Sequence, residues 1–143
     1  MNKKIQEKIE YLTRKFGTND PMELACCLNI KVLFVPMGKI AGFYIYMKHR
    51  RCIYINLEIE NISFLRVVIA HELGHAIFHP KENCTFMASH TLLLTSKIER
   101  QANLFAAHLL ITDELLNEFE EYTQEQFCNS TGYPMELLKL KLN

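Results

Sequence analysis

His71-Glu72-Leu73-Gly74-His75 is the stretch that decides how this chain folds and what it binds. It matches the pattern H-E-x-x-H, in which two imidazoles one helical turn apart bind one metal ion and the carboxylate between them moves protons. The pattern requires a helix, because only a helix places residues four apart on the same face. The motif therefore predicts a helix that binds a metal ion.

Working outward, both histidines fall on one stripe of the predicted helix, about 80° wide, together with Phe64, Val68 and Phe78. A second, apolar stripe consists of Ile62, Leu65, Ile69, Leu73, Ala76 and Ile77. The helix, predicted from Glu60 to His79, is therefore buried on two sides. A metal ion would satisfy two buried imidazoles at once, and the alternative is a pair of core histidines with separate hydrogen-bond partners.

Two histidines leave a tetrahedral zinc ion without its third protein ligand, and a catalytic site keeps the fourth position open for water. His79 lies eight residues after His71, about 12 Å along the helix axis, so both cannot bind one ion. The motif variant with a third histidine beyond a glycine turn is absent, because His75 is followed by Ala76-Ile77-Phe78-His79-Pro80. We expect His79 to end the helix without binding metal.

A second helix, predicted from Ser96 to Ile111, offers a better third ligand. Glu99 heads a stripe of small and apolar residues, and Asn103 follows one turn later on the same face. We expect Glu99 to bind the metal and Asn103 to hydrogen-bond an imidazole ligand. His108 points to the opposite face. The alternative for Glu99 is a solvated carboxylate in a first helical turn.

The remaining sequence predicts a mostly helical α+β fold in one domain, residues 1–143, whose C-terminal helical segment is 112–143. Further helices are predicted at about 5–16, 20–29, 112 onward, 123–132 and 134 onward. Three strands are predicted at 31–36, 42–47 and 51–59, the last two forming a hairpin. The hairpin turn holds neither glycine nor asparagine, so its type is not predicted, and 81–96 is expected to be a loop.

The amino-acid composition argues against several classes of partner and site. The 143 residues are 49% apolar and carry 16 basic and 16 acidic side chains, which is typical of a globular protein. A net charge of zero removes the general attraction to phosphate, so we expect no direct nucleic-acid partner. No run approaches the ~20 apolar residues of a membrane span, so we expect a cytoplasmic protein without a membrane partner. The five cysteines lack C-x-x-C spacing and predict no disulfide framework or thiolate zinc site.

The motif, followed by E-R-Q-A-N-L-F-A-A-H-L-L-I-T-D from Glu99, resembles the ImmA/IrrE family of metallo-endopeptidases, and the likeness is greatest on the ImmA side. The resemblance covers most of the chain. It implies a zincin-like domain of the gluzincin type, with a three-stranded sheet packed on the motif helix. It also implies Zn²⁺ as cofactor, His71, His75 and Glu99 as zinc ligands, and Glu72 as catalytic base.

The resemblance further implies a substrate, namely the helix-turn-helix repressor of a phage or integrative element, whose cleavage derepresses the element's genes. The chain departs from the family pattern at two positions. Many relatives have a second acid where Gln101 stands, which favours Glu99 as the ligand here. Proline is often found in place of Thr112, and we expect this difference to affect only the helix end.

Two other functions compete with proteolysis. A zinc-stabilised regulatory protein could bind a repressor without cleaving it, but a purely structural site would not need Glu72 as a base. A DNA-binding regulator is disfavoured because residues 112–143 contain seven acidic side chains and two lysines, a net charge of −5.

The sequence leaves two parts of a protease site open. His49, His90, Tyr44 and Tyr46 are all candidates to stabilise the oxyanion of amide hydrolysis. The strand from Gly42 to Met47 could be the edge strand along which an extended substrate lies, or equally a strand inside the sheet.

Overall fold

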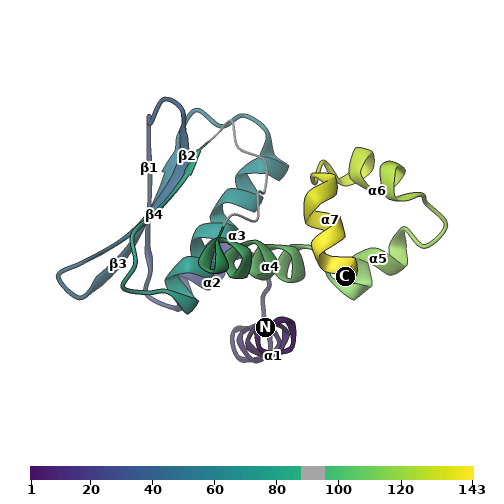
Figure 1. Cartoon of the computed structure of the whole chain (residues 1–143), viewed down its shortest axis with the longest axis horizontal. Coiled ribbons are helices and arrows are strands. Elements are labelled where there is room, and N and C mark those ends of the chain that lie inside the picture. The colour runs from purple at the N-terminus through teal and green to yellow at the C-terminus, as the bar shows by residue number, and fades with distance from the viewer. Residues whose placement is uncertain (88–95) are drawn as a thin grey trace.

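The computed structural model describes residues 1–87 and 96–143, which form a four-stranded sheet with the helices on one side of it (Figure 1). The helices are α1 (Asn2–Phe16), α2 (Pro21–Cys27), α3 (Ile62–Phe78), α4 (Lys97–Leu110), α5 (Asp113–Glu118), α6 (Gln124–Thr131) and α7 (Met135–Leu142). The strands are β1 (Lys31–Val35), β2 (Ile40–Met47), β3 (Arg50–Asn56) and β4 (Cys84–Met87). Within the described ranges, no helix has the length and apolar character needed to cross a membrane.

Side-chain caps set the helix starts where the sequence predicts them. The side chains of Asp20, Asn61, Ser96, Thr112 and Thr123 each accept a hydrogen bond from the backbone N–H three residues later. The capping box at the start of α6 is complete. Glycines at 17 and 132 end α1 and α6 in the left-handed conformation.

The sheet has the order β1-β3-β2-β4, with β1 parallel to β3 and the other pairs antiparallel. The predicted hairpin of β2 and β3 is confirmed. Its turn residues Lys48 and His49 both have positive φ, 52° and 63°, as in a type I′ turn, although such turns usually contain glycine or asparagine. The prediction of three strands is wrong, because residues 84–87 of the expected loop pair with β2 as a fourth strand.

Helix α3 lies between the sheet and α4, at the centre of the molecule (Figure 1). All residues from Val67 to Ala76 are buried, as the two stripes on the predicted helix require. Two glycines permit this packing. A β-carbon at Gly42 would lie 2.9 Å from the Val68 side chain, and one at Gly74 would lie 3.1 Å from the Cα of Ala102 on α4. Strand β2 therefore lies closer to the Val68 side chain, and α4 closer to the α3 backbone, than a residue with a β-carbon at either glycine would permit.

Helices α5 to α7 form the end of the molecule remote from the sheet (Figure 1). Leu137 and Leu138 of α7 are buried against α4 and join the same apolar core as α3. The hydroxyl of Ser63, at the start of α3, donates to the carbonyl of Thr131 at 2.7 Å. The start of the motif helix is thus tied to the end of α6.

Candidate metal centre

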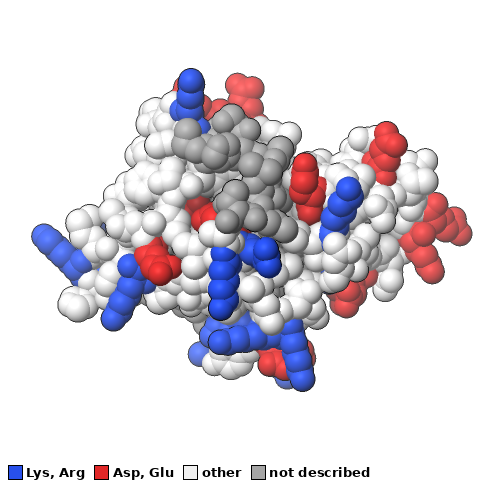
Figure 2. Space-filling model, in the orientation of Figure 1, with Lys and Arg blue, Asp and Glu red and all other residues white. Residues whose placement is uncertain are grey.

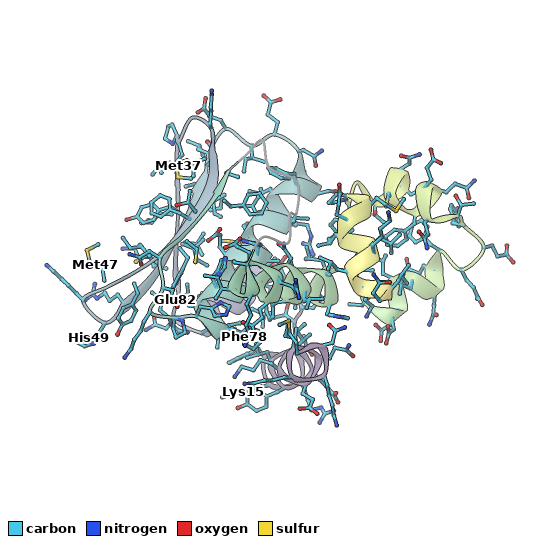
Figure 3. All side chains as sticks on the ribbon, viewed as in Figure 1. Lys15, Met37, Met47, His49, Phe78 and Glu82 are labelled. Atoms are coloured by element: carbon cyan, nitrogen blue, oxygen red, sulfur yellow. The ribbon has the colours of Figure 1, made fainter. Side chains whose placement is uncertain are left out.

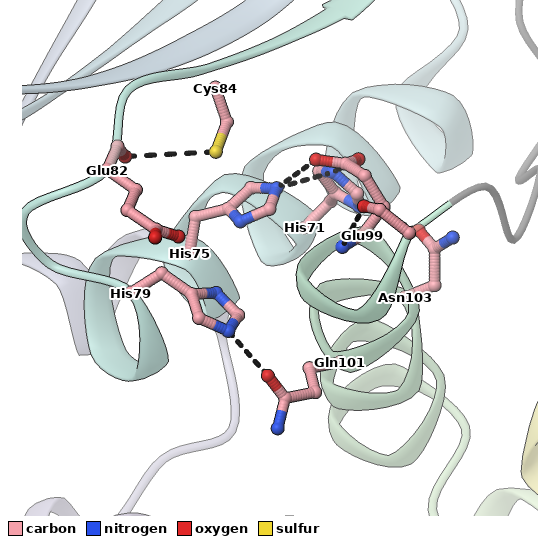
Figure 4. A network of polar contacts seen from close by, with 9 residues as sticks. His71, His75, His79, Glu82, Cys84, Glu99, Gln101 and Asn103 are labelled. Carbon is pink, nitrogen blue, oxygen red and sulfur yellow. Dashed lines mark hydrogen bonds and ion pairs between the residues drawn. The ribbon is translucent and has the colours of Figure 1, made fainter.

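Helices α3 and α4 bring three predicted metal-binding residues together. His71 and His75 lie one turn apart on α3, and Glu99 lies in the first turn of α4 (Figure 4). One possible ligand atom from each residue lies within 4.8 Å of the other two. The Nε2 atoms of the imidazoles are 3.1 Å apart, and Glu99 oxygens lie 3.1 Å from that of His71 and 2.8 Å from that of His75. The three residues form the only such group that the described ranges contain.

Asn103 determines how His71 presents its ring. The Oδ1 atom of Asn103 lies 2.7 Å from Nδ1 of His71, and both side chains are buried. Because an amide oxygen only accepts hydrogen bonds, Nδ1 carries the hydrogen, and a neutral His71 keeps a lone pair on Nε2. This is the hydrogen bond that the sequence predicts between Asn103 and an imidazole.

The lone pair on Nε2 of His71 faces the Glu99 carboxylate and Nε2 of His75. Lone pairs that face one another inside a protein repel, and a cation between them removes the repulsion. Two imidazole nitrogens and a carboxylate oxygen are also the donor types that zinc and similar divalent metals prefer. The residues present therefore fit a divalent metal ion.

Glu72 is a fully buried carboxyl group beside this cluster. Its side chain is 0% exposed, and neither of its oxygens has a hydrogen-bond partner among the described residues. Burial raises the pKa of Glu72 well above its usual value, and the charge of Glu99 raises it further. A buried carboxyl group without partners is costly to the fold, which is typical of a group retained for chemistry.

The pKa values of two predicted metal ligands, His75 and Glu99, are also shifted. Burial lowers the pKa of His75, which favours the neutral, metal-binding form of the imidazole. Burial alone would raise the pKa of Glu99, but the neighbouring imidazoles of His71 and His75 outweigh burial and hold the pKa below its usual range. The lowered pKa favours the ionised form of Glu99, which is the form that binds metal.

His79 and His108, which are not predicted to bind the metal, lie outside the cluster of His71, His75 and Glu99. His79 ends α3 and its Nε2 contacts Oε1 of Gln101, on the side of the cluster away from Asn103 (Figure 4). His108 of α4 contacts the side chain of Asn2 at 3.1 Å. Gln101, which occupies the position of a second acid in many relatives, therefore pairs with His79 and does not belong to the cluster.

The described candidates for oxyanion stabilisation contact groups other than the predicted metal ligands. Tyr44 is buried and its hydroxyl donates to the carbonyl of Pro80. Tyr46 and His49 contact each other at 3.3 Å, and His49 lies at the end of the hairpin, far from α4 (Figure 3). His90 lies outside the described residues.

Only part of the predicted strand from Gly42 to Met47 lies inside the sheet. Residues 42 to 44 pair with β3 on one side and with β4 on the other, whereas residues 45 to 47 pair only with β3 among the described strands. In the described part of the sheet, β4 is therefore the outer strand beside the motif helix. Beyond this pairing, Asn83 accepts a hydrogen bond from the backbone of Tyr46 at 3.0 Å.

Strand β4 also supplies a contact that the sequence argument missed. The ring of Phe86 meets the imidazole of His71 edge to face, with centroids 4.7 Å apart and planes at 89°. Cys84 and Phe86 are buried and Thr85 between them is exposed. This alternation is the available sequence signal, but it spans too few residues to identify a strand.

Two histidines of an H-E-x-x-H helix and a carboxylate from the neighbouring helix are the arrangement of a metallopeptidase site. Comparison with known proteins agrees. The family model described as "IrrE N-terminal-like domain", of the M78 peptidases, matches residues 25–140. The chain belongs to this family of metallopeptidases.

Two relatives match over nearly the whole chain. "Uncharacterized immunity region protein 2" of Bacillus phage phi105 is 37% identical over 142 residues, which cover 96% of this chain and 88% of that protein. "Metallopeptidase ImmA" of Bacillus subtilis (strain 168) is 34% identical over 146 residues, which cover 99% of this chain and 86% of that protein.

Proposed function

We propose that this protein is a zinc-dependent endopeptidase in which His71, His75 and Glu99 hold the metal and Glu72 is the catalytic base. The observation that carries the proposal is the convergence of three ligand atoms within 4.8 Å beside a buried carboxyl group that has no hydrogen-bond partner among residues 1–87 and 96–143. A structural metal site would explain the first feature but not the second, because it has no use for a base.

A bound zinc ion would supply Lewis acidity, which polarises a peptide carbonyl and makes water a stronger acid. Glu72 then accepts a proton from the attacking water and delivers it to the leaving amine, so that one amide and one water yield a carboxylic acid and an amine. Asn103 keeps the His71 ring in the orientation and tautomer that zinc requires.

For the substrate, we propose the helix-turn-helix repressor of a phage or integrative element, cleaved in the cytoplasm where such a repressor binds its operator. The resemblance to the ImmA side of the family supports this substrate. So do the names of two relatives, one an immunity region protein of a phage and the other Metallopeptidase ImmA. Cleavage of the repressor would derepress the genes of the element.

The decisive experiment is co-expression with the repressor encoded beside the protein's gene, in three versions: wild type, Glu72→Gln, and Glu60→Gln as an exposed control. We expect repressor fragments with wild type and with Glu60→Gln, and intact repressor with Glu72→Gln although its zinc content is unchanged. Derepression by Glu72→Gln without fragments would favour a protein that binds the repressor and does not cut it. Cleavage by Glu72→Gln would exclude Glu72 as the base.

The ligand set has a separate test. Glu99→Ala should lower the zinc content of the purified protein, whereas Gln101→Ala, two residues later on the same helix, should leave it unchanged. Unaltered zinc content in Glu99→Ala would mean that another group is the third ligand.

A further inference from the structure

A cavity of about 560 Å³ lies at the end of the sheet where α2 ends and β1 and β3 begin. Its walls include Lys31, His49, Arg50 and Arg51, together with the thiol-bearing residues Cys26 and Cys52. The parallel pairing of β1 with β3 sets Lys31 beside Cys52, so the basic starts of both strands meet at one end of the sheet. The metal-binding residues of α3 and α4 do not line this cavity.

The cavity is positively charged without local compensation. Residues 24–57, which run from α2 to the end of β3, contain five lysines and arginines and no aspartate or glutamate. None of the ion pairs between described residues involves Lys31, Arg50 or Arg51. In Figure 2, basic side chains project at the hairpin end, with an acidic side chain beside them, and most of the acidic side chains seen lie over α5 to α7.

Backbone geometry holds the charged groups in place. Arg51 donates to the carbonyls of Leu28 at 2.8 Å and Ala76 at 3.4 Å, where α2 and α3 end. These contacts fix the guanidinium and neutralise the partial negative charge of two helix ends, and three of its five N–H donors remain for a ligand. His49 is held in the left-handed turn and contacts the hydroxyl of Tyr46.

We propose that this cavity binds a small polyanion, a molecule with at least two phosphate or carboxylate groups. The volume lies within the range of about 300–1,000 Å³ that is usual for small-molecule sites and is too large for a single phosphate. Three cationic side chains around one concave surface, of which Arg51 is held by hydrogen bonds, and no carboxylate among the lining residues favour multiply charged anions over neutral ligands. The site is independent of the proposed peptidase chemistry.

The test is calorimetric titration of the full chain with inorganic tripolyphosphate and, separately, with citrate, which distinguishes a phosphate from a carboxylate ligand. The double variant Lys31→Gln/Arg50→Gln removes two cavity cations. The matched control Lys39→Gln/Lys48→Gln removes two exposed cations of the same basic segment that do not line the cavity. We expect saturable binding at one site, weakened about tenfold or more by the cavity variant and less than about threefold by the control.

A local readout tests the position of the ligand. Cys26 lines the cavity and its neighbour Cys27 does not, although both are exposed. In Cys27→Ser protein, the bound polyanion should slow alkylation of Cys26, whereas in Cys26→Ser protein the alkylation of Cys27 should proceed at its normal rate. Absence of saturable binding to either anion would overturn the proposal. So would equal weakening by the two double variants, which would indicate only diffuse attraction to a basic surface.

Discussion

Replacing Gly74 with alanine should lower stability and weaken metal binding together, because Gly74 is where α4 touches α3. A β-carbon at residue 74 would lie 3.1 Å from Cα of Ala102 and 3.2 Å from Cβ and Cδ1 of Phe105. Since carbon atoms pack best at about 3.5–4.0 Å, α4 would have to retreat by roughly 0.4–0.9 Å. Neither the helical backbone at Ala102 nor the buried Phe105 ring can turn aside.

The two consequences have different sizes. Overpacking costs about 1–3 kcal/mol, and alanine regains about 1 kcal/mol over glycine inside a helix, so the free energy of unfolding should fall by about 1 kcal/mol. Glu99 lies on α4 one turn before Ala102, so the same retreat draws its carboxylate away from the two imidazoles. Metal-ligand distances tolerate only about 0.2 Å, and zinc affinity should therefore fall about tenfold or more.

Urea unfolding of the metal-free protein and zinc competition with a chromogenic chelator measure the two effects. Gly17→Ala is the matched control, because Gly17 has φ +69° and no atom within 4 Å of the added carbon. It should cost about 1 kcal/mol through backbone strain and leave zinc affinity unchanged. If Gly74→Ala proves more stable than wild type and binds zinc equally well, the close approach of α3 and α4 does not position Glu99.

Three further predictions follow from single contacts. Asn103→Ala should reduce zinc affinity about 10- to 100-fold in chelator competition, and undiminished affinity would show that the hydrogen bond to His71 does not matter. Tyr44→Phe should lower the free energy of unfolding by about 1 kcal/mol, since the Pro80 carbonyl loses its donor; an unchanged urea midpoint would contradict this. Burial raises the pKa of Glu72 in the folded state above the unfolded value of about 4.3. The stability that the Glu72 side chain contributes is therefore fully present below about pH 4.3, and it is lost as the pH rises through the folded pKa. Glu72→Gln should therefore stabilise the metal-free protein by about 1 kcal/mol at pH 7 and change it little near pH 4, and equal effects at both pH values would argue against this linkage.

Periodicity could predict the helices and the relations within one helix, because the 3.6-residue repeat determines which side chains share a face. His71 and His75 share a stripe for this reason, and Glu99 and Asn103 share another. The pairing of the two stripes across α3 and α4 was predicted from chemistry, since two imidazoles need a third ligand. The helix starts predicted near residues 20, 96, 112 and 123 agree with the structure for a similar reason, because each is set by a cap whose hydrogen-bond partner lies only three residues away.

Strand β4 and its contacts could not be predicted in the same way. Four residues give only two periods of alternation, and Cys84 to Met87 form a strand because β2 offers an unpaired edge, which is a property of the assembled sheet. Which residues of β2 lie at the edge of the sheet could not be predicted for the same reason, because this depends on where β4 pairs. The I′ turn at Lys48 and His49 likewise results from the twist of the paired strands, which overrides the local preference of two residues that favour negative φ.

The burial of α3 on both faces links the fold to the chemistry. A helix exposed on one side could turn its imidazoles toward water, but here the sheet holds one side and α4 the other, and Phe86 and Asn103 both contact His71. The apolar core thus holds lone pairs and a carboxyl group in an arrangement that is unfavourable without a cation. A ligand that binds only the folded state adds stability as RT ln(1 + [L]/Kd), about 2.7 kcal/mol at a hundred times Kd. Zinc should therefore raise the melting temperature of wild type clearly and that of Glu99→Ala much less, and an equal rise in both would mean that the ion binds elsewhere.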